Sequence, residues 1–318
     1  MFRAFFIFLS KAFWAQKLIM NWKFAWRVAS RFIAGISIDD VIKVVKNLND
    51  QGLNVTVDHL GENAITVKDT LAATKEVIVL LEAINSNGVQ ANVSIKLSQL
   101  GLNIDKELCK SNLQSIFEQA KIMQNFIRID MEDSSITQET LDLVNWLKNT
   151  YSGVGTVIQS YLFRSEKDVE NLSNECIPIR MVKGAYKEPA QVAFPKKKDV
   201  DENFDHLIRI CLDKISQCNY PEISNNGRFP PLIAIASHDE LRIENAILNA
   251  NIKNLSKKTY EIQMLYGIRR DLQKKYSQLG YPVRVYVPYG THWYPYFMRR
   301  LAERPANVWF LFSNLFRK

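Results

Sequence analysis

Charged side chains occur inside or directly after several of the apolar runs in this sequence. Lys96 ends the segment Val-Ser-Ile-Lys, Asp130 ends Ile-Arg-Ile-Asp, and Arg180 sits within Ile-Pro-Ile-Arg-Met-Val. Burying a charge is costly unless it is paired. Each of these residues therefore belongs either to an interior ion pair, for instance Lys96 with Asp130, or to a site for a charged ligand.

The other residues at or just after the ends of the apolar runs are mostly polar. They are Asp58, His59, Met131, Glu132, Gln159, Tyr161, Lys183, Gly184, Ala185, Tyr186, Ser237, His238, Gln263, Tyr266, Tyr286 and Gly290. If the runs are parallel strands, these residues meet at one edge of a sheet or at one mouth of a barrel. A mouth rich in Arg, Lys, Asp and Tyr suits an anionic substrate and an anionic cofactor.

Several familiar catalytic arrangements are missing from the sequence. The four histidines form no HxH or HExxH motif, so a catalytic metal is not expected. No G-x-G-x-x-G or Walker A segment occurs, and no Ser/His/Asp or Cys/His triad stands out. The cysteines at 109, 176, 211 and 218 form no CxxC pair. We expect them to be free thiols in a reducing compartment, without a disulfide framework.

The elements that must position these residues alternate in type. Eight short runs rich in Val, Ile and Tyr are expected to be strands: 53–57, 91–97, 126–130, 155–161, 177–182, 232–236, 260–265 and 283–287. The segments between them are typical of helices: 66–85, 105–124, 137–149, 165–174, 202–217, 239–251 and 267–279. Such alternation predicts a parallel sheet with right-handed crossovers. An open sheet could give the same pattern, but the count of eight and the missing dinucleotide motif favour a closed (β/α)8 barrel.

Local signals refine the ends of some helices. Ser37 with Asp40 predicts a capping box that opens a helix through Asn47. Helix caps are also expected at Asp105, Thr137, Ser165 and Asp239. The basic stretch 196–198 is expected to lie in a solvated loop between 194 and 202.

The chain divides into an N-terminal helical segment, 1–50, and a barrel, 51–318. Its 318 residues carry a net charge of +8, and 47% of them are hydrophobic. Residues 1–35 contain six basic residues and no acidic one, interleaved with aromatic and aliphatic residues. We expect an amphipathic helix over 11–34, stopped by Gly35, that packs on its own protein or lies on a membrane surface. The charges are too frequent for a transmembrane span or signal peptide.

Several motifs together resemble those of the flavin-dependent proline dehydrogenase family. The two most telling are Arg-Met-Val-Lys-Gly-Ala-Tyr at 180–186 and Tyr-Phe-Met-Arg-Arg-Leu-Ala-Glu at 296–303. The match also includes Ser-Ile-Lys-Leu at 94–97, Ile-Asp-Met-Glu at 129–132, and further segments at 157–161, 261–267 and 285–288. The motifs keep their order between about 58 and 307, so the resemblance covers most of the chain.

The resemblance implies a distorted TIM-like barrel with its last helix over the barrel mouth. It implies noncovalent FAD as cofactor and oxidation of L-proline to Δ1-pyrroline-5-carboxylate. The electrons would pass to a quinone, and a separate pyrroline-5-carboxylate dehydrogenase would take the product, since no fused portion fits this length. Nucleic acid is not expected as a partner. The implied location is cytoplasmic, with a peripheral membrane contact left open.

The resemblance also assigns roles to residues. Arg299, Arg300 and Lys96 would hold the substrate carboxylate, which suits the bidentate geometry of guanidinium groups. Tyr286 and Tyr296 would form the apolar wall, and Asp130 would hold Lys96 in place. Arg180 would lie near flavin N5. The remaining cofactor contacts would be Met131, Gln159, Lys183, Gly184, Ala185, Ser237 and His238.

Three other functions compete with this one. Hydroxyproline dehydrogenase is the nearest, and the bulky Tyr286 argues for plain proline. Methylenetetrahydrofolate reductase is more distant, and the pair Arg299 and Arg300 argues against it. A basic protein that binds membranes or nucleic acid would explain the N-terminal charge but not the residues at the strand ends.

Overall fold

Eight parallel strands close into a barrel in the computed structural model, which describes residues 9, 12, 16, 19–20, 23–61 and 64–303. Each strand pairs with the next along the chain, and β8 pairs with β1. The strands are β1 (Asn54–His59), β2 (Ala91–Ile95), β3 (Ile127–Ile129), β4 (Val154–Gln159), β5 (Ile179–Val182), β6 (Ile233–Ala236), β7 (Tyr260–Leu265) and β8 (Val283–Tyr289). The predicted barrel is confirmed, and no strand end differs from its predicted position by more than two residues.

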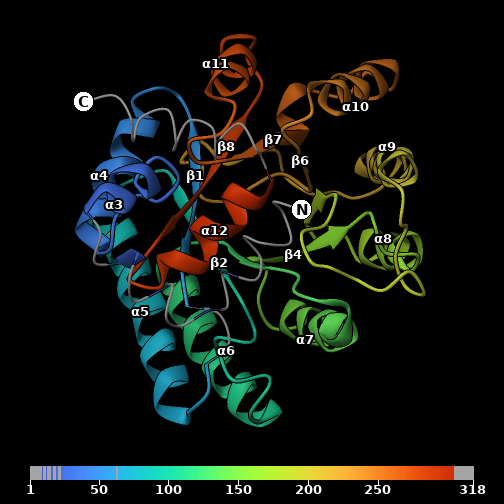
Figure 1. The fold of residues 1–318 in the computed structure, drawn as a ribbon. Helices are drawn as coiled ribbons and strands as arrows, with labels where there is room; N and C mark the ends of the chain where they lie inside the picture. The colour runs from blue at the N-terminus through green and yellow to red at the C-terminus, as the bar shows by residue number, and fades with distance from the viewer. Residues whose placement is uncertain are drawn as a thin grey trace.

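A ring of helices surrounds the barrel (Figure 1). These are α5 (Val67–Ser86), α6 (Lys106–Ile122), α7 (Thr137–Lys148), α8 (Ser165–Asn174), α9 (Lys197–Ile215), α10 (Glu240–Ile252) and α11 (Arg270–Gln278), with short 3-10 turns at Ser134–Ile136 and Lys257–Thr259. The prediction of a loop at 196–198 was wrong, because α9 begins at Lys197. Lys197 pairs with Asp201 one turn further on, which supports a helix from its first residue.

Two of the predicted helix caps are confirmed. Ser37 forms a capping box with Asp40 at the start of α4 (Ile38–Asn49), and the Asp105 carboxylate accepts the N–H of Leu108 at 2.7 Å. Thr137 and Ser165 are instead the first residues of their helices. The Asp239 side chain caps nothing, because it binds a lysine at the barrel mouth.

The last described helix, α12 (Trp293–Glu303), lies across the open end of the barrel (Figure 1). The predicted position of the final helix is thereby confirmed. The described part of the basic N-terminal helix, α3 (Lys23–Ala29), packs against α12 in one apolar cluster, with Trp26 edge-on to Trp293 at 5.4 Å. This helix ends at Ala29, earlier than predicted, and the chain turns to bind β8 through Ala34 N–H and the Pro288 carbonyl. The rest of the predicted N-terminal helix falls mostly outside the described residues.

A turn-rich loop, 224–231, closes the opposite end of the barrel beneath the strands. The Gly227 carbonyl accepts a hydrogen bond from Arg284 at 2.8 Å, and the Arg228 carbonyl accepts one from Asn92 at 3.1 Å. The Arg228 guanidinium in turn donates to the Met123 carbonyl and to Asn85. Backbone polar groups of the loop thus satisfy buried side chains that point down from the barrel interior.

The expectation that no disulfide forms was wrong. Cys176 and Cys218 are bonded; their Cα atoms are 5.7 Å apart, and the residues are 42 positions apart in sequence. Cys176 lies between α8 and β5, and Cys218 follows the end of α9. Because α8 and α9 are neighbours in the ring, the chain segments after both helices meet at one end of the barrel. Cys109 and Cys211 are buried thiols as predicted, and burial raises the pKa of each to about 12.

Candidate active site

The interior of this barrel is charged, whereas most β/α barrels are filled with branched apolar side chains. Alternate residues of the strands point inward, and here many of them are polar. The buried interior set includes Asp58, Ser94, Lys96, Arg128, Asp130, Arg180, Glu261, Gln263 and Arg284. Their hydrogen bonds run from strand to strand across the barrel.

Lys96, just past the end of β2, binds two carboxylates at the mouth. Its ammonium lies 2.8 Å from Asp58 on β1 and 3.5 Å from Asp130 just past β3. It also donates to the Tyr286 hydroxyl at 3.4 Å. The sequence allowed an interior ion pair between Lys96 and Asp130 as one of two interpretations. This pair is present, but the contact of Lys96 with Asp58 is shorter.

Asp130 is the acceptor at the centre of the cluster. Its Oδ1 accepts from the Arg180 guanidinium and from the Ser94 hydroxyl, each at 2.8 Å. Its Oδ2 accepts from the Tyr286 hydroxyl at 2.6 Å. Residues from three different strands, β2, β5 and β8, thus converge on one carboxylate, which makes Asp130 the hub of the cluster.

The environment shifts the pKa values of Asp58 and Asp130 in opposite directions. Burial raises the pKa of Asp58 to about 6, against the opposing charge of Lys96 and with the help of the Asp130 charge. Burial also acts to raise the pKa of Asp130, but Arg180 and Lys96 outweigh it, and the net pKa is lowered. Asp130 is therefore an ion at neutral pH, while Asp58 titrates close to the physiological range.

Arg180 on β5 crosses the barrel interior. Besides its bond to Asp130, its Nε donates to the Gln263 carbonyl oxygen at 2.6 Å, and its guanidinium carbon lies 5.1 Å from the centre of the Tyr286 ring. Burial and the nearby carboxylates raise the pKa of Tyr286 well above its usual value. The phenol therefore keeps its proton and remains a donor to Asp130.

α12 supplies the residues above the mouth. Arg300 and Tyr296 are buried, Arg299 is half-buried, and the Arg300 guanidinium stacks on the Tyr296 ring at 4.9 Å. Three- and four-residue spacings put residues on one helix face, which is why Tyr296 and Arg300 meet.

A second group of residues follows β3, β4 and β5. Met131 is buried directly after Asp130. The Gln159 amide nitrogen, at the end of β4, donates to the Glu132 carbonyl at 2.9 Å, and Glu132 itself binds the backbone and hydroxyl of Ser98. These contacts tie the ends of β2, β3 and β4 together.

The segment after β5 exposes backbone at the mouth. Gly184 has φ +121, and a Cβ there would lie 2.4 Å from the Tyr161 ring, so only glycine fits. Gly184 and Ala185 are exposed. The Lys183 ammonium is held between Asp201 at 2.6 Å and Asp239 at 2.9 Å.

Ser237 and His238 follow β6. The Ser237 hydroxyl accepts from the backbone of Asp239 at 3.1 Å. His238 Nε2 accepts the N–H of Leu265 at 2.9 Å, so the neutral ring carries its proton on Nδ1.

Asp58 and Gln263 are among the residues of this network that were not given a role from the sequence. Asp58 and Gln263 both lie among the polar residues of the strands, but nothing local distinguishes them from their neighbours. The alternation of side chains along a strand could have identified them, because every second residue points into the barrel. Asp58 points inward like Thr56, two positions earlier on β1, and Gln263 points inward like Glu261, two positions earlier on β7. An inward-facing Lys96 also demands a carboxylate on an adjacent strand.

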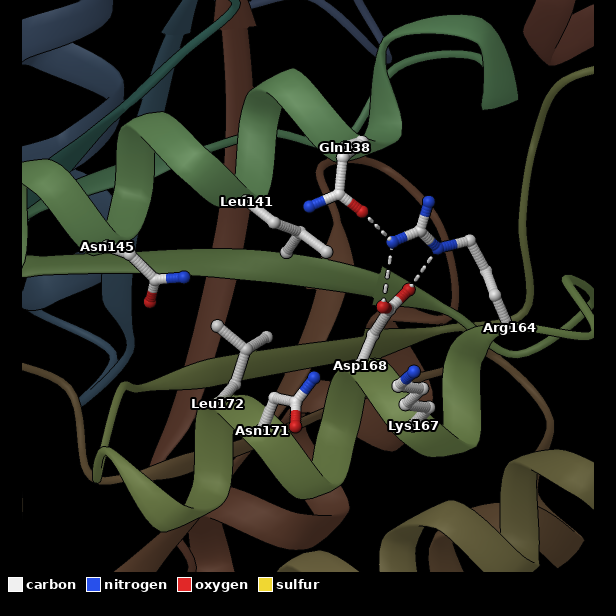
Figure 2. A pocket seen from close by; sticks show the side chains of 8 residues that line it. All are labelled: Gln138, Leu141, Asn145, Arg164, Lys167, Asp168, Asn171 and Leu172. Atoms are coloured by element: carbon white, nitrogen blue, oxygen red, sulfur yellow. Dashed lines mark hydrogen bonds and ion pairs between the residues drawn. The ribbon is translucent and has the colours of Figure 1, made fainter.

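A groove on the outside of the molecule is separate from this cluster. It lies between α7 and α8, encloses about 470 Å3, and is lined by Gln138, Leu141 and Asn171 among others (Figure 2). Arg164 at its edge is bound by Asp168 at 2.7 Å and by Gln138 at 2.6 Å. Its charge is thus already matched by its own neighbours.

Fold and site together define a class: a β/α-barrel enzyme whose charged interior opens beneath a covering helix that bears two arginines. Comparison with known proteins then specifies the family. Residues 41–312 match the proline dehydrogenase family. Proline dehydrogenase 2 of Bacillus subtilis (strain 168) is 40% identical over 99% of both chains, and the proline dehydrogenase of Deinococcus radiodurans is 39% identical over 92% of this chain and 91% of its own.

A solved structure shows the same fold. Proline utilization A (PutA) from Bdellovibrio bacteriovorus, inactivated by N-propargylglycine, superposes with a TM-score of 0.78 at 26% identity. The match covers 88% of this chain and 33% of that one. The chain belongs to the proline dehydrogenase family. The resemblance and the enzyme class predicted from the sequence, an oxidoreductase of proline catabolism, are thereby confirmed.

Proposed function

We propose that the enzyme oxidises L-proline to Δ1-pyrroline-5-carboxylate with FAD as its bound electron acceptor and passes the electrons on to a quinone. The observation that carries this proposal is the cluster of Lys96, Asp130, Arg180 and Tyr286 beneath an α12 that bears Arg299 and Arg300. The similarity to named proline dehydrogenases over nearly the whole chain supports the choice of substrate.

The donor groups suit a flavin dinucleotide on one side of the mouth. Gln159, Arg180, Ser237 and His238 follow or belong to three adjacent strands, β4 to β6, and offer an amide, a guanidinium, a hydroxyl and an imidazole. The exposed backbone at Gly184 and Ala185 permits close approach of the cofactor. Met131 would contact the flavin. Lys183 would take part through its backbone, because its ammonium is engaged by two carboxylates.

The opposite side of the mouth, formed by α12, β8 and β2, would hold proline. Arg299, Arg300 and Lys96 bind the carboxylate, and the rings of Tyr286 and Tyr296 pack against the pyrrolidine. Asp130 orients Lys96, Arg180 and the Tyr286 hydroxyl at once. The protein thus fixes the position of C5, and its rate enhancement comes from orientation and charge stabilisation.

The reaction needs no base of high strength. Proline enters with its amine unprotonated, the C5–H bond breaks, and the nitrogen lone pair forms the C=N bond. FAD, held by Met131, Gln159, Ser237 and His238, would supply the two-electron acceptor for this hydride. Arg180 would stabilise negative charge on the reduced cofactor.

The test is spectroscopic. Purified protein should be yellow, and its visible flavin band should bleach when L-proline is added without oxygen. Colourless protein that cannot be reconstituted with FAD, or a flavin band that proline leaves unchanged, would refute the proposal. Comparing kcat/KM for proline and hydroxyproline tests the role of Tyr286, for which we expect a clear preference for proline.

We further propose that the enzyme is cytoplasmic, hands its product to a separate pyrroline-5-carboxylate dehydrogenase, and reaches its quinone through a peripheral membrane contact. Among the described residues, no helix combines the length and apolarity needed to cross a bilayer. The segments that motivate a membrane contact are 1–35 and 309–318, and of these the structure describes residues 9, 12, 16, 19–20 and 23–35. Co-sedimentation with anionic liposomes, with and without residues 1–22, tests the contact, and equal negligible binding would exclude it.

A further inference from the structure

Behind Arg180, a buried chain of polar groups runs down the barrel interior. Gln263 on β7 accepts from Arg180 Nε at 2.6 Å and donates through its amide nitrogen to Glu261 on the same strand. Glu261 is bound by Arg284 of β8 through both oxygens, at 2.9 and 3.0 Å. Glu261 and Arg284 have no exposed surface, and Gln263 is 3% exposed.

The chemistry of the chain dictates which way the Gln263 amide points. Glu261 is a carboxylate in a fully buried ion pair, so it can only accept hydrogen bonds. The amide nitrogen of Gln263 must therefore face Glu261, and its oxygen must face Arg180. Arg284 is itself anchored by the carbonyls of Val55 and Gly227, each at 2.8 Å, so the whole support is rigid.

This arrangement leaves Arg180 with one carboxylate partner, Asp130, and two neutral ones, Gln263 and the Ser94 hydroxyl, which accepts from both terminal nitrogens at 3.3 Å. Asp130 binds its NH1 at 2.8 Å, while the Gln263 oxygen binds its Nε. A carboxylate at position 263 would neutralise Arg180 further and would also lie against Glu261. A residue without an acceptor would leave the buried Nε–H unsatisfied, and the guanidinium would then be held only through its terminal nitrogens, by Asp130 and Ser94.

We propose that Gln263 is a positioning residue, backed by the pair of Glu261 and Arg284, that fixes the guanidinium of Arg180 so that its charge acts on the bound flavin. This inference rests on the proposed function, because it needs a flavin beside Arg180. It assigns to Gln263 an effect on the flavin midpoint potential, since a misdirected or neutralised cation stabilises the reduced, negatively charged flavin less well.

The experiment compares Gln263→Met with Gln263→Glu in the flavin-loaded enzyme by spectroelectrochemistry. Gln263→Met should shift the ratio of reduced to oxidised flavin about tenfold towards the oxidised form, which is about 30 mV for a two-electron couple. Gln263→Glu should keep the wild-type potential near pH 6, because its carboxyl group, held protonated by Glu261, can accept from Arg180 and donate to Glu261 as glutamine does. At higher pH its ionisation should lower the potential.

The matched control is Gln273→Met. Gln273 is also a buried glutamine, but it bonds backbone carbonyls on the outer side of β7, so its loss should lower thermal stability and leave the potential unchanged. A wild-type potential in Gln263→Met, or a Gln263→Glu variant that matches Gln263→Met near pH 6, would overturn the inference. If Gln263→Met fails to fold, Gln263→Glu alone tests the inference. A midpoint potential that differs from that of the wild type by the same amount at every pH from 6 to 9 would overturn the inference.

The two proposals fail in different ways. Wild-type protein whose flavin bleaches with proline upholds the proposed function whatever the variants do. Wild-type protein without flavin overturns both.

Discussion

Replacing Asp58 by Asn should abolish most of the pH dependence of anion binding at the site. Asp58 shares Lys96 with the proposed substrate carboxylate, and its pKa is raised to about 6 by burial. Below that pH Asp58 is neutral and no longer competes with an anion for the Lys96 ammonium. As the pH rises through 6, Asp58 ionises and competes, so binding to the wild-type enzyme should weaken.

The structure sets the size of the effect. Asp58 lies 2.8 Å from the Lys96 ammonium, and a ligand carboxylate on the same ammonium would make a contact of about 2.8 Å. The two carboxylates would then be about 6 Å apart. At an effective dielectric constant of about 20, their repulsion is about 2.8 kcal/mol. This corresponds to about a hundredfold change in the dissociation constant as an upper limit.

The assay is calorimetric titration, from pH 5 to 8, with a proline analogue that has oxygen in place of the ring nitrogen. The analogue has no amine to titrate, so the profile reports the protein alone. Wild type and Asp58→Asn should bind alike at pH 5, and Asp58→Asn should bind more tightly at pH 8. If the dissociation constant of Asp58→Asn depended on pH as steeply as that of the wild type, the reasoning would be refuted.

His59 needs its own control. Burial lowers its pKa, Glu76 acts in the opposite direction, and the charges of His292 and Lys96 lower the pKa further. Protonation of His59 would favour anions at low pH, as protonation of Asp58 does. The His59→Gln variant should keep the pH dependence of ligand binding around pH 6. If the pH dependence disappeared in this variant, the imidazole and not Asp58 would be its cause.

Three further results are expected. Arg299→Met and Arg300→Met should each raise the KM for proline by at least about thirtyfold, the effect of losing roughly 2 kcal/mol from a charged pair, while the flavin absorbance per protein is retained; unchanged kinetics in both would refute the assignment. Thiol titration of denatured protein without reductant should find two reactive groups, and four after reduction, because Cys176 and Cys218 are bonded; four at the outset would disprove the bond. Gly184→Ala should lower flavin content, because a side chain there strains the backbone and meets an aromatic ring at 2.4 Å; full flavin content at wild-type stability would contradict this.

Much of the barrel could be predicted because local pattern decides it. Parallel strands are buried on both faces, so they appear as short apolar runs, and the helices between them carry a different period. The start of α9 was missed because its first turn, at Lys197, has the charged composition of a loop. The pairing of its side chains at four-residue spacing, as between Lys197 and Asp201, becomes visible only once the helix is assumed.

The members of the polar cluster at the mouth could be predicted, but the hydrogen bonds between them could not. Lys96, Asp130, Arg180 and Tyr286 were found from their positions at strand ends and from the family motifs. Which carboxylate Lys96 prefers depends on the stagger of β1 against β2, which no local pattern reveals. The bond between Cys176 and Cys218 escaped prediction for the same reason, because it depends on where two helices end in space.

The contacts of Arg284 also have a consequence for the order in which the barrel folds during synthesis on the ribosome. This one side chain joins Glu261, the Val55 carbonyl of the first strand and the Gly227 carbonyl of the loop beneath. Until residue 284 has been synthesised, Glu261 has no counter-charge from the last strand, and burying an uncompensated carboxylate costs about 3–5 kcal/mol. Nascent chains that stop before β8 should therefore remain open and sensitive to protease, and the barrel should close late, in a single step that unites its first and last strands.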